Sequence, residues 1–155
     1  MKSKKAEFKE ISVSLMKIQD CKFYYNLDFK CDKDELEEGK LPYSIIIKHQ
    51  ISYDLQNDLF YINLSVGYED KNNLILEAEN RFTFHVKGLK NIIKIKSGSL
   101  FSLDVDFLPT LINIAIGTMR GVIYSRTGSS PLSEIPLPMI SIEELMGNTT
   151  LNSAD

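Results

Sequence analysis

Residues 59–88, with the sequence LFYINLSVGYEDKNNLILEAENRFTFHVKG, decide the fold, because two runs of alternating apolar residues flank a short polar turn. Successive side chains of a strand point to opposite faces, so each run predicts a strand with one apolar face. The turn EDKNN at 69–73 predicts that the two strands pair as an antiparallel hairpin. The apolar faces hold Phe60, Ile62, Leu64, Val66 and Tyr68 on the first strand, and Leu74, Leu76, Ala78, Phe82, Phe84 and Val86 on the second.

The residues before this hairpin continue the alternation. Residues 45–55 form another alternating run, and the polar loop 56–58 joins it to the next strand as a second hairpin. Further back, residues 11–30 alternate with a phase slip near Met16. A β-bulge causes such a slip, so this segment is one long bent strand or two shorter ones. With the acidic stretch 31–42 as a solvated loop, the first part of the chain predicts a four-stranded antiparallel meander with one apolar face.

The period changes to that of a helix after residues 90–99, which fit a short strand or a connector. Helical spacing of apolar residues predicts a helix over about 106–126, with Asp104 or Asp106 as N-cap, Pro109 in the first turn and Gly128 just past the end. The helix is apolar nearly all round, and one sheet covers only one of its sides. We therefore predict that a second subunit covers the other side. The predicted interface residues are Leu111, Ile112, Ala115, Ile116 and Met119.

The last part of the chain is an apolar crossover followed by a short helix. Residues 125–139, SRTGSSPLSEIPLPM, contain three prolines and few charges, so we expect this segment to pack on the protein through Leu132, Ile135, Leu137 and Met139. Ser141 and Glu144 form a capping box that starts the helix. Residues 147–155 are expected to be a flexible tail. The predicted fold is therefore a single α+β domain spanning 1–155, with its core at about 8–146.

Composition excludes several classes of protein. An apolar fraction of 43%, a charged fraction of 25% and a mean hydropathy of −0.13 predict a soluble protein. The net charge of −3, with no basic block beyond the first five residues, argues against nucleic acid as a partner. The charge-free run 107–119 is shorter than a membrane span, and no apolar signal segment follows the basic start. Cys21 and Cys31 match no zinc or redox spacing, which favours reduced cysteines in the cytoplasm.

Catalytic chemistry finds little support in the sequence. His49 falls on an apolar strand face, where a satisfied core or interface histidine is the simpler interpretation. His85 shares the opposite face with Glu77, Glu79 and Arg81, a pattern that any solvated strand face shows. Metal-binding and phosphate-loop motifs are absent from the sequence. We therefore expect no enzyme, no cofactor and no metal site, and the excess apolar surface predicts contact with a sister subunit or an extended client peptide.

The order of these elements resembles the SecB family of protein-export chaperones over about residues 8–146. Residues 59–88 look like the third and fourth strands of that family. FLPTLINIAIGTMRGVIYSRTG (107–128) is similar to its long helix, and SPLSEIPLPMISIEEL (130–145) is similar to its Pro-rich crossover and last helix. The resemblance implies an ATP-independent holdase that keeps preproteins unfolded and passes them to the motor of the Sec translocase. It also implies a homotetramer, built as a dimer of dimers, with the long helices between two sheets.

The resemblance further implies where clients and the motor bind. Clients would lie as extended segments in apolar grooves, and Glu77, with Glu79 beside it, would belong to the motor-binding face. The residues 147–155 lack the Cys/His zinc tail of the family's exporters, so a SecB relative with a dedicated client such as an antitoxin is an alternative. A hotdog-fold acyl-CoA thioesterase-like enzyme and an interaction subunit with one folded partner are the others. The groove candidates are Phe60, Phe82, Phe84, Ile135, Leu137 and Met139.

Overall fold

Strands come first in the chain, and the long helix follows them. The computed structural model describes residues 10–30, 34, 38, 43–102, 106–134, 137–146 and 150–153. The sheet strands are β1 (Val13–Tyr25), β2 (Ser44–Asp54), β3 (Leu59–Asp70) and β4 (Asn73–Val86). After them come the 3-10 turn η1 (Leu89–Asn91), the strands β5 (Ile93–Lys96) and β6 (Ser99–Ser102), the helix α2 (Phe107–Arg126), the turn η2 (Pro131–Glu134), the helix α3 (Ile142–Met146) and the strand β7 (Thr150–Ser153).

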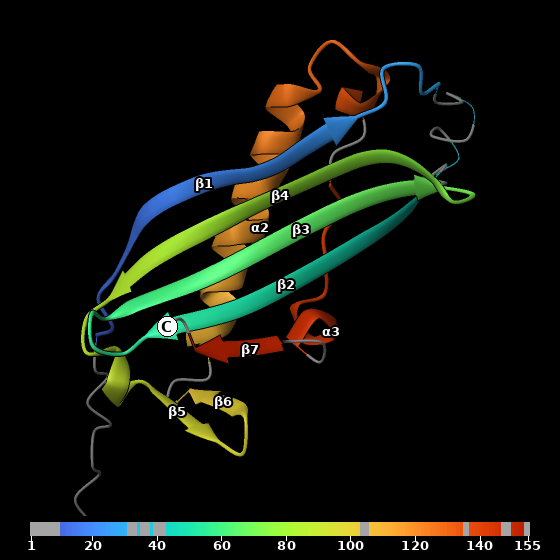
Figure 1. Ribbon diagram of the computed structural model, residues 1–155. Coiled ribbons are helices and arrows are strands. Elements are labelled where there is room, and N and C mark those ends of the chain that lie inside the picture. The colour runs from blue at the N-terminus through green and yellow to red at the C-terminus, as the bar shows by residue number, and fades with distance from the viewer. Residues whose placement is uncertain are drawn as a thin grey trace, which may run out of the picture.

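The main sheet has the strand order β1-β4-β3-β2-β7, and α2 crosses one of its faces (Figure 1). The strands β1 to β4 pair antiparallel, so the predicted α+β arrangement of a four-stranded antiparallel sheet followed by a long helix is confirmed. Lys71 and Asn72 turn β3 into β4 with φ values of 47° and 70°. Two successive positive φ values match the twist of the flanking strands, which explains this tight hairpin.

The bend predicted near Met16 is a β-bulge in a single strand. The pairing of β1 with β4 shifts register between Leu15 and Lys17, so Met16 is the extra residue. A second shift between Asp20 and Lys22 makes Cys21 a second extra residue, which the sequence did not reveal. Each extra residue restores the apolar side chains that follow it to the helix side of the sheet. As a result β1 follows the curved sheet as one bent strand.

The core lies between the helix side of the sheet and α2. Phe60, Phe82 and Phe84 are all fully buried there, and the ring of Phe60 meets that of Phe107 edge-on with centroids 5.6 Å apart. The helix buries eight side chains, and the predicted subunit interface is among them. These side chains are Phe107, Leu108, Leu111, Ile112, Ala115, Ile116, Met119 and Ile123. The residues predicted to face a second subunit are therefore buried within the chain itself.

Helix α2 begins and ends close to the predicted limits. Asp106 takes the N-cap position, as predicted, but its side chain makes no capping hydrogen bond, and Pro109 falls in the predicted first turn. At the C-terminal end the Thr127 hydroxyl donates a 2.7 Å hydrogen bond to the carbonyl oxygen of Ile123. By length and a mean hydropathy of 1.3 the helix is apolar enough to cross a membrane. The eight buried side chains pack it on the sheet instead, so it is the core helix of this fold.

The C-terminal part differs in two respects from the sequence-based expectation. In the crossover Leu132 and Leu137 are buried as predicted, but Met139 is 91% exposed, and Ile135 lies outside the described residues. Within the expected tail, β7 pairs parallel with residues 50–53 of β2. The outer edge of β2 offers main-chain donors and acceptors that a neighbouring strand satisfies, and this pairing needs no apolar side chains. The sheet therefore has a fifth strand.

Candidate functional site

A groove lined mostly by apolar residues, with polar atoms also exposed in it, separates the crossover from β2. Its walls are two alternate residues of β2 on one side and the segment before and within α3 on the other. We call it the crossover groove; it is lined by Ile45, Ile47, Pro138, Met139, Ile140, Ser141 and Leu145. Met139 is 91% exposed, while Ile45, Ile47 and Ile140 are half-buried and pack against the core. The groove therefore presents apolar side chains to solvent on a floor that the core supports.

The crossover wall is held by Arg120 of α2. Its Nε donates a 2.7 Å hydrogen bond to the carbonyl oxygen of Leu137, and its terminal nitrogen donates a 3.1 Å bond to that of Pro138. Pro138 has no N–H to donate, so this stretch makes fewer main-chain hydrogen bonds, and the guanidinium holds it through its carbonyl groups instead. The buried Leu137 side chain anchors the same point to the core. Met139 thus projects from a fixed stretch of backbone.

An aromatic stack lies beneath this region of the helix. The Tyr43 and Tyr68 rings stack with centroids 4.7 Å apart and planes 13° apart. Burial raises the pKa of Tyr68 to about 12, and the nearby charge of Arg120 only partly opposes this. Because Tyr68 stays protonated throughout the physiological range, it is a neutral support and offers no acid–base chemistry near neutral pH.

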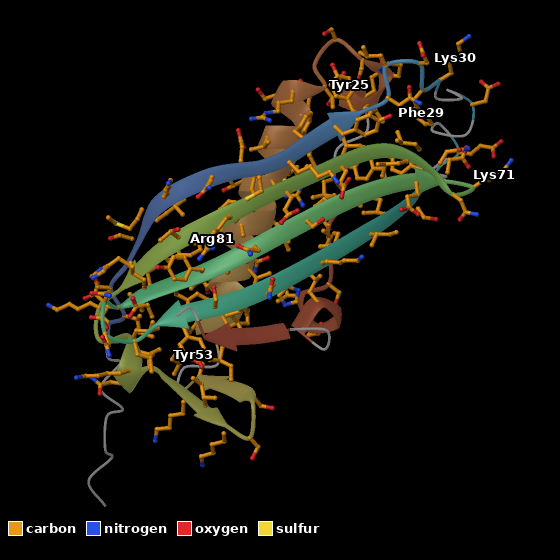
Figure 2. All side chains as sticks on the ribbon, viewed as in Figure 1. Tyr25, Phe29, Lys30, Tyr53, Lys71 and Arg81 are labelled. Carbon is orange, nitrogen blue, oxygen red and sulfur yellow. The ribbon has the colours of Figure 1, made fainter. Side chains whose placement is uncertain are left out.

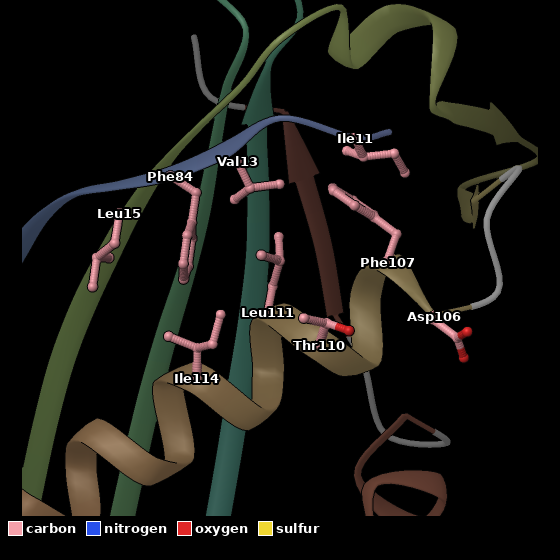
Figure 3. Close-up of a pocket in the computed structure, with 9 residues that line it drawn as sticks. All are labelled: Ile11, Val13, Leu15, Phe84, Asp106, Phe107, Thr110, Leu111 and Ile114. Carbon is pink, nitrogen blue, oxygen red and sulfur yellow. The ribbon is translucent and has the colours of Figure 1, made fainter. Parts of the chain in front are cut away.

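A second apolar groove lies between the N-terminal half of β1 and the first turns of α2. Figure 3 shows side chains from the two elements facing one another across this space. We call it the β1–α2 groove; it is lined by Ile11, Val13, Leu15, Phe84, Asp106, Phe107, Thr110, Leu111 and Ile114. Val13, Leu15 and Ile114 are between 36% and 41% exposed. Sequence alternation identified Ile11, Val13 and Leu15 as one apolar face, but it did not show that this face is left partly uncovered.

The opposite end of β1 is closed by a polar cluster. Arg126, the last residue of α2, pairs with Asp20 and lies over the Phe23 ring, 4.9 Å from its centroid. The buried Asn80 amide donates a 2.9 Å hydrogen bond to the same carboxylate. These contacts fix the C-terminal end of the helix to β1. The strand is therefore tied down at one end and leaves the groove open at the other.

The outer side of α2 is an uncovered stripe. Ile114 is 40% exposed and Tyr124 is 61% exposed, and between them lie Gly117 and Gly121. A methyl group added at either glycine would meet no described atom of the chain within 4 Å. The two glycines leave the middle of this stripe without side chains, so another backbone can approach the helix closely there. Among the described residues, the stripe and the β1–α2 groove are thus apolar surfaces at the helix that stay uncovered, whereas the predicted set at Leu111 to Met119 is buried within the chain.

The outer face of the sheet is polar and carries the predicted acidic pair. Glu77 forms an ion pair with Lys22, with 2.6 Å between the carboxylate Oε2 and the lysine Nζ. Glu79 borders a shallow depression together with Lys48 and Asn63. Arg81, labelled on this face in Figure 2, lies 4.4 Å from the centre of the Tyr61 ring. Glu77 and Glu79 therefore share one face, as predicted, but a lysine already partners the first of them.

The structure also places the remaining candidate residues, which are phenylalanines, a histidine and the cysteines. Phe60 and Phe82 belong to the closed core, and Phe84, although buried, forms the back wall of the β1–α2 groove. His49 is on the helix face as expected, and burial lowers its pKa. Cys21 is a free, exposed thiol, and Cys31 lies outside the described residues. Among the residues that the structure describes, no group of three or more His, Cys, Asp or Glu is arranged to hold a metal ion.

Sequence comparison finds no matching family model and no matching curated protein. Among solved structures, the chain is similar to the SecB-like chaperone Rv1957 of Mycobacterium tuberculosis in complex with a ChAD peptide from the antitoxin HigA1, Rv1956. The TM-score is 0.46 at 15% identity, covering 83% of this chain and 86% of that one. It is also similar to a protein of unknown function from Streptococcus agalactiae, with a TM-score of 0.44 at 12% identity, covering 86% of this chain and 99% of that one.

Proposed function

We propose that this protein is a SecB-like holdase, which binds extended apolar segments of unfolded polypeptides and releases them without chemistry. The observation that carries the proposal is the crossover groove, in which Met139 is 91% exposed beside Ile45, Ile47 and Ile140. An exposed, adaptable thioether beside several apolar side chains is the kind of surface that receives an apolar segment of another chain. The element order, confirmed from β2 to α3, is the one that the resemblance to the SecB family implied.

The groove suits many client sequences rather than one. Its side chains are apolar, and Met is adaptable in shape, so the contact is insensitive to the exact side chains of the client. Burial of one medium-sized apolar side chain contributes about 1.5–3 kcal/mol, so a single short segment binds weakly. Several grooves on one assembly would bind a long unfolded chain at several points and raise the overall affinity.

We further propose that the protein is a homo-oligomer, most simply a dimer of dimers. The uncovered stripe from Ile114 to Tyr124 and the β1–α2 groove are the surfaces on which sister subunits would meet. Covering them removes from water the same apolar surface that made the helix unusual in the sequence. The crossover groove shares no lining residue with the β1–α2 groove, so in this proposal it is the surface left to clients.

The client class admits two versions. In the first, the protein works in the cytoplasm on preproteins, and the outer sheet face with Glu77 and Glu79 docks on the motor of the Sec translocase. In the second, the groove serves one dedicated client, such as an antitoxin segment of the kind bound by the chaperone in the M. tuberculosis complex. Binding to the purified motor, and its loss in an E77K/E79K variant, would favour the first version. Tight binding of one segment and no protection of other clients would favour the second.

The holdase proposal is tested by mixing the purified protein with a chemically unfolded client and following light scattering as the client is diluted into buffer. We expect the protein to suppress aggregation without ATP, at near-stoichiometric ratios. A protein that leaves aggregation unchanged would contradict the proposal. Detectable hydrolysis of acyl-CoA would instead support the thioesterase alternative, and capture of one folded partner at fixed stoichiometry would support an interaction subunit.

A further inference from the structure

Positive charge gathers in one segment of this acidic protein. The chain carries a net charge of −3, yet residues 80–103 contain no Asp or Glu. The lysines of this segment are Lys87, directly after β4, Lys90 in η1, and Lys94 and Lys96 in β5. All four are exposed. We call these four residues the lysine surface.

A small hairpin displays half of this surface. The strands β5 and β6 pair antiparallel through a turn at Ser97 and Gly98, whose φ values of 50° and 76° are those of a tight hairpin turn. The buried Ile93 anchors the hairpin to the core. Lys94 and Lys96 lie two residues apart on one strand, so their side chains share a face and leave the backbone about 7 Å apart. Figure 1 shows the hairpin projecting from the end of the main sheet near the start of α2.

The charges of the lysine surface are not neutralised by the protein itself. Within the described residues, none of the four amines lies at ion-pair distance from a carboxylate. The nearby Asp58 is committed to the backbone, because its carboxylate accepts 3.0 Å hydrogen bonds from the N–H groups of Gly88 and Leu89. These bonds lower the pKa of Asp58, with a smaller contribution from the charge of Lys90. The four positive charges are therefore available to a binding partner.

We propose that the lysine surface binds an acidic, extended segment of polypeptide whose carboxylates alternate along its length. Alternate side chains of an extended chain lie on one side with the spacing of Lys94 and Lys96, so their charges match in register. A nucleic acid fits less well, because its recognition uses a broad basic face, and this strip is narrow on an acidic protein. Association is expected to be weak at physiological salt and stronger at low salt. This goes beyond the proposed holdase function, whose groove takes apolar side chains, and it does not depend on it.

The test uses a fluorescent peptide of alternating Glu and Thr, with a matched peptide of alternating Gln and Thr, and measures binding by anisotropy at low salt. We expect the intact protein to bind the Glu peptide and not the Gln peptide. The K94E/K96E variant should lose binding by about ten-fold or more. The K30E/K71E variant makes the same change in net charge at the opposite end of the sheet, where Figure 2 labels both residues, and should change binding less than about two-fold.

Three outcomes would overturn the inference: no binding of the Glu peptide by the intact protein, equal losses in the two charge-reversed variants, or tighter binding of a single-stranded oligonucleotide of equal charge. Circular dichroism of each variant reports whether it is folded. If K94E/K96E does not fold, K94Q/K96Q removes the same charges without reversing them. We then expect a loss of about three-fold or more in that variant, and an unchanged affinity would contradict the proposal.

Discussion

The Nε of Arg120 donates a 2.7 Å hydrogen bond to the carbonyl oxygen of Leu137, so the helix that lies on the sheet also holds the crossover in place. Seventeen residues separate the two in the chain. Together with the second bond, to Pro138, the guanidinium fixes the backbone on which Met139 stands. Stability of the helix layer and shape of the crossover groove are therefore joined through one side chain.

Replacement of Arg120 by Met is expected to weaken both the fold and the groove. The two hydrogen bonds are made by a charged donor, and their loss leaves the Leu137 and Pro138 carbonyls without these partners, which should lower the free energy of unfolding by about 2–3 kcal/mol. Urea denaturation measures this loss. R120K keeps the charge but not the paired donors, so it should recover only part of it. Wild-type stability in R120M would show that water replaces the guanidinium at no cost.

Leu137 and Met139 are two residues apart and should respond in opposite ways to truncation. Leu137 is 2% exposed, so L137A removes core packing and should lower the free energy of unfolding by about 2–5 kcal/mol. Met139 is 91% exposed, so M139A should change stability by less than about 0.5 kcal/mol. M139A should instead weaken binding of an unfolded client several-fold. Client affinities near wild type in M139A, at unchanged stability, would place client binding elsewhere.

The lowered pKa of Asp58 predicts how the stability of the protein changes at acidic pH. Its folded-state pKa is lowered from the ordinary value of 3.8, first by the hydrogen bond from Gly88. A group whose pKa is lower in the folded state contributes its full stabilisation at pH values above its unfolded-state pKa. This stabilisation is lost as the pH falls through the folded-state pKa. The difference in unfolding free energy between wild type and D58N should therefore be largest near neutral pH and shrink below about pH 4.

Asn is the appropriate replacement, because Asp58 has a φ of 57° and Asn also adopts this conformation readily. Urea denaturation at a series of pH values from 7 to 2 measures the effect. E134Q, which removes an exposed carboxylate in η2, serves as the control and should run parallel to wild type. A difference between wild type and D58N that stays constant with pH would mean that the loss is steric rather than electrostatic.

The sequence predicts those parts of the fold whose signal is local. Alternation over residues 59–88 identified the core faces of β3 and of most of β4 because a strand's period is set by its own backbone, and the phase slip marked the bulge at Met16. At the start of β4 it was wrong, since Leu74 is exposed and Ile75 is buried where the register shifts after Tyr68. The helix was different. Because α2 is apolar nearly all round, its period did not tell which side meets the sheet or that the residues from Leu111 to Met119 are buried within the chain itself.

Contacts between distant residues were also beyond the sequence. Nothing in the local pattern pairs Arg120 with Leu137, since any surface arginine near a helix C-terminus has the same signature. The pairing of β7 with β2 runs through main-chain groups, which every residue has, so the mostly polar sequence of Thr150–Ser153 did not predict a strand. Of the groove candidates, Met139 was expected to pack on the protein, and its exposure appeared only in the structure.

The uncovered side of α2 provides the last prediction, which concerns assembly. Ile114 is 40% exposed and lines the β1–α2 groove, and Tyr124 is 61% exposed further along the helix. If sister subunits cover this side, a lysine at position 114 would be buried without a partner, which is strongly unfavourable. I114K and Y124K should therefore weaken self-association by about ten-fold or more while the monomer stays folded.

Light scattering coupled to size-exclusion chromatography, over a range of concentrations, measures the mass. S129K, in the exposed turn after the helix, is the matched control and should assemble as wild type does. A wild-type protein that runs as a monomer, or variants with unchanged mass, would leave this apolar side free for clients rather than for sister subunits.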